Sequence, residues 1–366
     1  MAVLQGPRRC VGSALLFLLG LLVGRLSCDL HGAGLSLDYV PRWTPSSSLA
    51  APLAAEPAPI ELGVLSGARV ATCDSHVVER GLKPMAVIAT TMRDAGEDEI
   101  RRKIQRNTIR GFMAQTPVDA VHPLVFTDSD SLAAEVREET IKVQGDGLET
   151  VAPIPEVRHG FPTIRGIMKE ALAAARRAGA SYYGYANGDI LFTEDLVATL
   201  RLVSEASRAD FFPPPSSLLG AQPGVMIIGR RTNFNFADYV DHIDHQSPCK
   251  LSELFLNMAK DGKPMVPHAI DYFIFSTEAR VDWGALEDWI IGNLAFDQYL
   301  VKYAGLAKLH IIDATDTIHA FHQTGSDGNS AGHARPKEAS AHNGQLWEEL
   351  GPGGCKVRNN NKSAAE

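Results

Sequence analysis

The sequence predicts an α/β protein in which helices flank a mostly parallel β-sheet, and two observations support this. Short apolar runs that are typical of buried parallel strands alternate with longer segments whose apolar residues recur at helical spacing. The 366-residue chain is 45% hydrophobic and 21% charged, which is usual for a globular protein with a sizeable core. We therefore expect one sheet with helices on both faces.

The first half of the expected domain alternates regularly between strands and helices. The apolar run from Pro84 to Met92 predicts a buried strand, and a charged amphipathic helix follows over about Glu97 to Met113. The other elements expected here are a strand at Val121–Thr127, a helix at Ser131–Glu139, a short strand at Thr140–Gly145, a helix at Phe161–Ala178, a strand at Tyr182–Ala186 and a helix that begins near Glu194.

The second half is less regular. Strands are expected within Gly224–Phe236 and Ala269–Ala279, and a long amphipathic helix over Leu286–Ala304. Leu309–Gln323 predicts two short strands, of which the second ends in histidine. The tail from Thr324 onward is rich in Gly, Ser, His and Asn, which predicts a loop.

The amino terminus carries a targeting signal. Arg8 and Arg9 precede an apolar run from Cys10 to Gly24, so residues 1–28 are expected to be a signal anchor or a signal peptide. The run is shorter than the roughly 20 residues that span a bilayer comfortably, yet no clean cleavage site follows it. Either alternative sends the globular part into the secretory pathway. It would lie in the Golgi or ER lumen as a type II membrane protein, or be secreted after cleavage.

Composition also sets the domain boundaries. Residues 29–66 include a segment rich in Ala, Pro and Ser, which predicts a flexible stalk or linker. Folded structure is expected over residues 67–330, followed by a loop-like tail at residues 331–366. Asn361 in this tail opens a glycosylation sequon, which would be used only in the lumen.

Net charge and cysteine spacing argue against nucleic-acid binding and against a zinc cluster. The net charge of -8 and the pI of about 5.9 argue against nucleic acid, because no basic stripe is present to neutralise phosphates. None of the five cysteines forms a CxxC pair, so a zinc cluster is not expected. One disulfide could form among Cys73, Cys249 and Cys355 in an oxidising compartment, and the sequence does not show which two would pair.

Polar residues follow three of the predicted strands at the point where each strand ends. These are Thr90-Thr91, Thr127–Ser129 and Asn187–Asp189. In a parallel sheet such ends meet at one edge, and ligands bind in the crevice outside it. The carboxylate of Asp189 and the amide oxygen of Asn187 are ligands that Mg²⁺ or Mn²⁺ accepts beside a substrate phosphate. The same tripeptide, Asn-Gly-Asp, also favours a simple turn.

Several segments together resemble a known family. "GFPTIRGIMKEALAAA" precedes the strand that ends in Asn187-Gly188-Asp189, and "ILFTEDLVATL" follows it. Further along the chain come "GVMIIGRRTNF", "AIDYFIFSTEA", "IIGNLAFDQYLVKYA" and "IIDATDTIHAFHQ". This order resembles the glycosyltransferases of GT-A fold, the nucleotide-diphospho-sugar transferase-like proteins, and in particular poorly characterised members. The resemblance covers roughly Met85 to Gln323 and implies a Rossmann-like, GT-A-like sheet.

The resemblance implies a metal-assisted transfer of a sugar from a nucleotide-sugar donor to a hydroxyl of a glycan, lipid or protein. Asp189 would coordinate Mn²⁺ or Mg²⁺, and His322, or else His319, would complete the metal shell. Asp297 would be the general base, with Asp271 as the second candidate. The residues expected to line the nucleotide or the sugar are Thr90, Thr91, Arg93, Asp128, Arg165 and Asn187.

The chain departs from the family pattern at two places. Asn187 replaces the first aspartate of the Asp-x-Asp motif, and after Gln323 the family's second histidine is missing or displaced to His333. These departures support an alternative, a non-catalytic secretory protein that keeps the fold and binds a sugar or nucleotide. A metal-dependent hydrolase is a third hypothesis, for which His242 and His245 would be further candidate ligands; a solvated polar loop is the simpler interpretation of that pair.

Overall fold

The computed structural model describes residues 83–113, 115, 120–144, 148–209, 224–235, 254, 262–265, 270–324 and 337–349. The amino-terminal segment and stalk, all five cysteines, the His242–His245 pair, His333 and the Asn361 sequon lie outside these residues. The expectations about them therefore stay predictions. Within the described part, no helix is both long and apolar enough to cross a bilayer.

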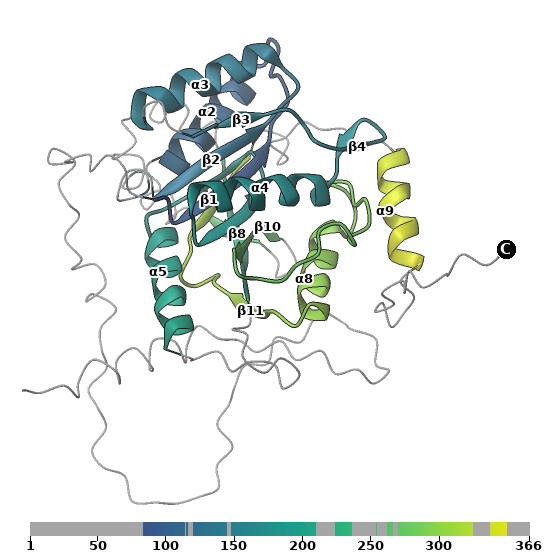
Figure 1. Ribbon diagram of the computed structural model, residues 1–366. Helices are drawn as coiled ribbons and strands as arrows, with labels where there is room; N and C mark the ends of the chain where they lie inside the picture. The colour runs from purple at the N-terminus through teal and green to yellow at the C-terminus, as the bar shows by residue number, and fades with distance from the viewer. Residues whose placement is uncertain are drawn as a thin grey trace, which may run out of the picture.

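One mixed sheet forms the centre of the molecule (Figure 1). Its strands run in the order β3-β2-β1-β6-β10-β8-β12-β7, with β9 and β11 also paired to β8. Only β7, β9 and β10 run against the others, so the expected mostly parallel sheet is confirmed. The strands are β1 (Ala86–Thr91), β2 (Val121–Phe126), β3 (Val151–Ala152), β6 (Tyr182–Ala186), β7 (Ile190–Phe192), β8 (Val225–Asn235), β9 (Lys263–Pro264), β10 (Ile270–Ser276), β11 (His310–Asp313) and β12 (Ala320–Thr324).

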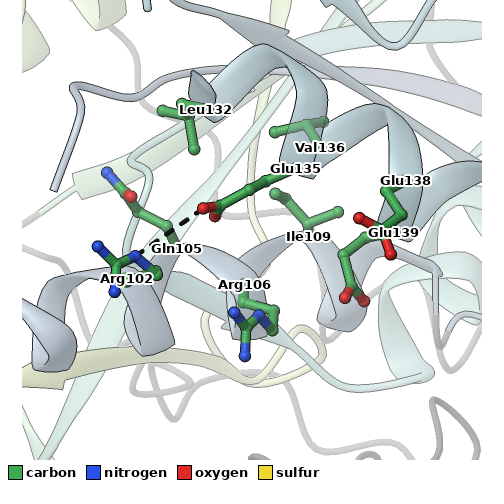
Figure 2. A pocket seen from close by; sticks show the side chains of 9 residues that line it. All are labelled: Arg102, Gln105, Arg106, Ile109, Leu132, Glu135, Val136, Glu138 and Glu139. Atoms are coloured by element: carbon green, nitrogen blue, oxygen red, sulfur yellow. Dashed lines mark ion pairs between the residues drawn. The ribbon is translucent and has the colours of Figure 1, made fainter. Parts of the chain in front are cut away.

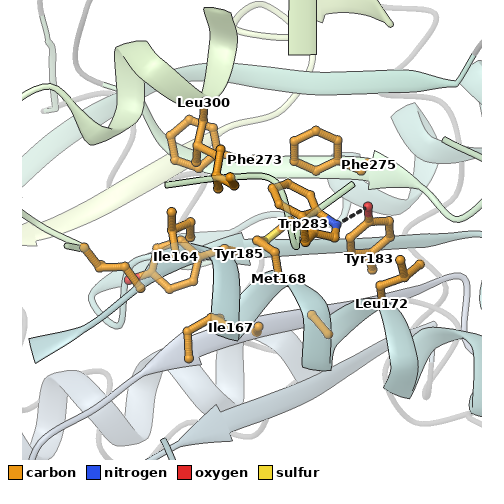
Figure 3. Packing of buried hydrophobic residues seen from close by; sticks show 14 of the residues in the cluster. Ile164, Ile167, Met168, Leu172, Tyr183, Tyr185, Phe273, Phe275, Trp283 and Leu300 are labelled. Atoms are coloured by element: carbon orange, nitrogen blue, oxygen red, sulfur yellow. Dashed lines mark hydrogen bonds between the residues drawn. The ribbon is translucent and has the colours of Figure 1, made fainter. Parts of the chain in front are cut away.

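Helices cover both faces of this sheet, because successive strand residues point to opposite sides. Ile88, Tyr182 and Ile274 pack on one face in a core shared with α5. Val87 and Tyr183 lie in a second core, shared with α4 and α8 (Figure 3). The helices are α2 (Glu99–Met113), α3 (Asp130–Gln144), α4 (Ile164–Ala178), α5 (Asp195–Arg208), α8 (Phe296–Leu306) and α9 (Lys337–Glu349).

Helix α4 shows how local sequence specifies these elements. Ile164, Ile167 and Met168 recur at helical spacing and are fully buried against the sheet (Figure 3). The helix ends at Gly179, whose φ of 68° is left-handed and whose N–H bonds back to the carbonyl of Arg176. The strand β6 then starts three residues later and enters the core.

One expected helix in the second half is shorter in the structure. The helix predicted over Leu286–Ala304 begins only at Phe296, as α8. Gly292 and Ala295 both have positive φ, 72° and 61°, which interrupts a helix before that point. Leu286, Trp289, Ile290 and Ile291, which contributed to the helical pattern, are still buried in the segment that precedes α8, whereas Leu294 is exposed.

Two further corrections concern a predicted short strand and the predicted loop-like tail. A short strand was predicted at Thr140–Gly145, but the residues up to Gln144 form the end of α3, and the neighbouring strand, β3, forms at Val151–Ala152. The tail predicted to be loop-like at residues 331–366 contains a helix, α9. Its buried Asn343 bonds Ile290 on both backbone groups, so polar contacts as well as apolar ones hold it.

A small hairpin lies outside the sheet, between β3 and α4. Strands β4 (Val157–Arg158) and β5 (Phe161–Pro162) pair antiparallel. Their two-residue turn, His159 and Gly160, has positive φ at both positions, 50° and 76°, as a type I′ turn requires.

Candidate functional site

Three strands bring the main candidate residues together at the carboxyl edge of the parallel strands. Asp189 directly precedes β7, Asp271 is the second residue of β10, and His322 is the third residue of β12. β12 places His322 between Ile190 of β7 and Asn233 of β8. Asp189, Asp271 and His322 are only 7%, 5% and 5% exposed. Two carboxylates and an imidazole are thus buried in one cluster, although they are far apart in the chain.

Asp271 is held by two donors on the same oxygen. Arg231 Nη1 and Asn187 Nδ2 each lie 2.6 Å from Asp271 Oδ1. Burial raises the pKa of the Asp271 carboxyl above its ordinary value; Arg231 and His322 oppose this rise and Asp189 adds to it. Asn187 therefore does what an aspartate could not do at this position, since its amide donates to a carboxylate.

Asp189 and His322 face each other. The distance from Asp189 Oδ2 to His322 Nε2 is 3.3 Å. Neighbouring ligands of an octahedral Mg²⁺ or Mn²⁺ lie about 3 Å apart, so this donor pair fits two adjacent positions of such an ion. Among the described residues, no group of three or more His, Cys, Asp and Glu side chains is arranged to hold a metal. An ion here would take its other ligands from water and from a substrate.

The turn that carries Asp189 is fixed by contacts with α2 and β12. The Thr108 hydroxyl donates to the carbonyl of Gly188 at 2.9 Å, and the Gln323 backbone N–H donates to the carbonyl of Asp189 at 3.0 Å. The fully buried Gln323 side chain also donates to the carbonyl of Ile104 and to Thr108. A Cβ added to Gly188 would lie 2.9 Å from the Thr91 carbonyl, so only glycine allows this approach to β1.

Two threonines at the end of β1 lie beneath this turn. Thr90 is fully buried, and its hydroxyl has no partner among the residues that the structure describes. The Thr91 hydroxyl lies 3.2 Å from that of Tyr185. Both threonines are therefore at the same sheet edge as Asp189, as the sequence predicts. That they line a nucleotide stays a prediction.

Three other predicted residues are engaged elsewhere. Arg93 lies over the ring of Phe161, 4.3 Å from its centroid, and donates to the carbonyl of Gly160, so it supports the β4–β5 hairpin. Arg165 forms a two-oxygen ion pair with Glu156. Asp128 is exposed and accepts from the backbone N–H of Ile154 at 3.2 Å. The contacts of Arg93, Arg165 and Asp128 are thus with the protein, and none joins the Asp189 cluster.

The remaining two candidates are Asp297, at the start of α8, and His319, which contacts the start of α5. Asp297 is half-buried in the first turn of α8, where its neighbour Phe296 packs on Phe273 of β10. Its role as a base stays a prediction. His319 contacts the Asp195 carboxylate in the first turn of α5, which raises the pKa of His319 through that hydrogen bond. His319 is therefore used by α5, whereas His322 is the histidine in the cluster.

Sequence reasoning missed two residues of the site. Arg231 was not among the predicted site residues, but its side chain is only 17% exposed and pairs with Asp271. Gln323 was identified only as the last residue of a segment that resembles the family, and no role was predicted for it. No sequence signal could have indicated either contact, since each partner lies on a different strand or helix.

A hollow of about 390 Å³ lies between α2 and α3 (Figure 2). Its lining mixes two arginines, Arg102 and Arg106, with three glutamates of α3, and Arg102 lies 3.9 Å from Glu135. None of the residues in the Asp189 cluster lines it. The hollow is therefore separate from the candidate site.

Comparisons with known proteins add little. No protein-family model matches the chain, and no curated protein matches it. A solved structure of S. aureus TarS 1–349 in complex with UDP-GlcNAc is similar at 12% identity and a TM-score of 0.28. The match covers 42% of this chain and 35% of the TarS chain, so this chain spans about a third of that protein. A TM-score this low carries no argument about fold or function.

Proposed function

We propose that the protein is a glycosyltransferase that moves a sugar from a nucleotide-sugar donor to a hydroxyl acceptor. The observation that supports it is the buried cluster of Asp189, Asp271 and His322 at the carboxyl edge of the parallel strands. Ligands bind outside this edge in open α/β sheets. Buried carboxylates and a histidine at this edge are costly for folding and are explained if they bind a ligand.

In this proposal Asp189 and His322 hold Mn²⁺ or Mg²⁺. The metal would supply Lewis-acid stabilisation for the negative charge of the leaving diphosphate. Asp189 and His322 provide a carboxylate oxygen and an imidazole nitrogen that already face each other. The hydrogen bond from the Gln323 backbone N–H to the Asp189 carbonyl fixes the backbone of Asp189, and so holds its carboxylate in place before any ligand binds.

A carboxylate is also needed to take the proton from the acceptor hydroxyl. Asp297 is our candidate, because it is half-buried at the start of α8, whereas Asp271 already receives two donors on one oxygen. The acceptor would be a glycan, a lipid or a protein. The secretory location is proposed on Arg8, Arg9 and the apolar run after them.

A second candidate function is a binding protein without turnover. Asn187 favours it, because an amide in place of the first aspartate leaves one carboxylate fewer for a metal. Both candidates require the cluster to bind a nucleotide sugar, and they differ in whether nucleoside diphosphate is released.

Thermal unfolding with and without ligands tests the proposal. A ligand at 100 times its dissociation constant adds about 2.7 kcal/mol to the free energy of unfolding. We expect a rise in Tm with one nucleotide sugar that requires Mn²⁺ and is absent in Asp189→Asn. Asp316→Asn, an exposed carboxylate in the loop before β12, is the matched control and should keep the rise.

Other outcomes separate the alternatives. A ligand-dependent rise without release of nucleoside diphosphate would favour the binding protein. No rise with any nucleotide sugar, with or without Mn²⁺, would refute both candidates.

A further inference from the structure

Within the Asp189 cluster, the ion pair of Asp271 and Arg231 leaves some of its hydrogen-bonding groups without partners among the described residues. We propose that this pair binds two neighbouring hydroxyl groups of a sugar ring, and so recognises the sugar of the donor. This rests on the proposed function, because the sugar must lie next to the diphosphate that Asp189 and His322 would hold.

The two carboxylate oxygens of Asp271 differ in the number of hydrogen bonds that they accept. Oδ1 accepts from both Arg231 and Asn187, at 2.6 Å each. Oδ2 is buried and has no hydrogen-bond donor among the residues that the structure describes. A buried carboxylate oxygen without a donor is costly. A bound ligand would therefore be expected to supply one.

The guanidinium of Arg231 is also held in place, although not all of its N–H donors are used. Its Nε donates to Asn233 at 3.1 Å and its Nη1 donates to Asp271. Within the described part of the chain, Nη2 has no hydrogen bond. Two side-chain contacts thus hold the guanidinium in one orientation, with donor groups left for a ligand.

In the Arg165–Glu156 ion pair, by contrast, both carboxylate oxygens accept hydrogen bonds. Arg165 Nε lies 2.9 Å from Glu156 Oε1 and 3.0 Å from Oε2, so both carboxylate oxygens are used. The Arg231–Asp271 pair departs from this pattern although it is more buried. Its function is therefore not explained by stability alone.

An unused carboxylate oxygen next to unused guanidinium donors is complementary to two adjacent hydroxyls. One hydroxyl donates to Oδ2, and the other accepts from Arg231. A divalent cation is a poorer occupant, because Arg231 already neutralises the carboxylate. The site therefore favours a polyhydroxylated ligand such as a sugar ring.

Calorimetry with two kinds of nucleotide tests this. The full-length protein and Asp271→Asn are titrated, in Mn²⁺, with UDP and GDP and with UDP-glucose, UDP-GlcNAc and GDP-mannose. We expect Asp271→Asn to bind the nucleoside diphosphate as the wild type does, but to bind the matching nucleotide sugar roughly 10- to 100-fold more weakly. Equal weakening of both kinds, or of neither, would overturn the inference.

Deoxy analogues of the preferred sugar give a test whose first part uses only the wild type. Removing either of two adjacent hydroxyls should weaken binding to the wild type roughly 10-fold or more. In Asp271→Asn the loss for the hydroxyl that faces Oδ2 should largely disappear, because the two changes remove the same contact. If no single hydroxyl matters by more than about 3-fold in the wild type, the inference is wrong.

One arm separates this inference from the proposed function. If the wild type binds neither nucleoside diphosphates nor nucleotide sugars, the proposed function fails. Methyl glycosides are then examined by saturation-transfer NMR. Signals that Asp271→Asn abolishes would support the sugar subsite, whereas their absence would overturn it as well.

Discussion

At the scale of single residues, Asn187 is the most informative departure from the motif that the chain resembles. Its amide donates to Asp271 Oδ1, which Arg231 also contacts. The amide orientation follows from that contact, since only the nitrogen can donate to a carboxylate. Asn187 is thus matched to Asp271 and need not be a sign of lost function.

Restoring the aspartate is predicted to harm the protein. Asn187→Asp would place two carboxylates in contact where a hydrogen bond of 2.6 Å now exists, and we expect a loss of about 1–3 kcal/mol at pH 7. The raised pKa of one carboxyl in the folded state means that stability falls as pH rises. The deficit in Tm relative to wild type should therefore shrink toward pH 5.

The exchanged pair is the control for this prediction. Asn187→Asp combined with Asp271→Asn keeps one amide and one carboxylate in contact, so it should recover much of the lost stability. A double variant no more stable than Asn187→Asp alone would show that the amide–carboxylate contact is not the cause.

A second prediction concerns His319. Asp195 raises the pKa of His319, so this contact stabilises the fold fully below the ordinary histidine pKa of about 6.5 and is lost as pH rises through the folded value. Both side chains are partly exposed, which limits the contribution to under about 1 kcal/mol. His319→Gln should lower Tm at pH 5.5 and have almost no effect at pH 9. An equal loss at both values would contradict an ionic contribution.

At the scale of elements, close approaches between strands set the shape of the sheet at the site. Gly184 in β6 lies directly against β10, where an added Cβ would be 2.5 Å from the Phe273 carbonyl. The same two strands carry Asn187 and Asp271 at their adjacent ends. The spacing of β6 and β10 therefore determines the contact between those two side chains.

Substitution of this glycine tests that dependence. Gly184→Ala must push β10 away, and we expect a loss of about 1–3 kcal/mol in urea unfolding, together with weaker nucleotide-sugar binding. Gly305→Ala in α8 is the matched control, because nothing lies within 4 Å of the added methyl. It should be neutral or stabilise by up to about 1 kcal/mol. Similar losses in the two variants would refute the steric explanation.

At the scale of the whole molecule, most of the sheet and its helices could be predicted from the sequence. Apolar runs such as Ala86–Thr91 and the helical pattern from Ile164 give their positions directly. The interrupted helix before Phe296 could not be predicted, since burial and not helix formation produces the apolar pattern there. Helix α9 was missed because a polar, glycine-containing composition hides it.

The candidate site was predicted only in part, for a related reason. The carboxyl edge brings Thr90, Asn187 and Asp189 together, as strand ends in a parallel sheet must. The pairing of Arg231 with Asp271 depends on the register between β8 and β10, which local sequence does not specify. The family resemblance implied that Arg93 and Arg165 face the ligand. Their contacts are instead with Phe161 and Glu156, in and beside a hairpin that sequence reasoning did not foresee.

In the proposed function, Asp189 and His322 hold a divalent metal against a nucleoside diphosphate. Pulsed electron paramagnetic resonance of Mn²⁺ with UDP or GDP tests it directly, because a bound imidazole gives a nitrogen coupling. We predict this coupling in the wild type and in His319→Gln, and its loss in His322→Gln. A coupling that survives His322→Gln, or its absence from wild-type protein that binds both Mn²⁺ and the nucleotide, would contradict the assignment.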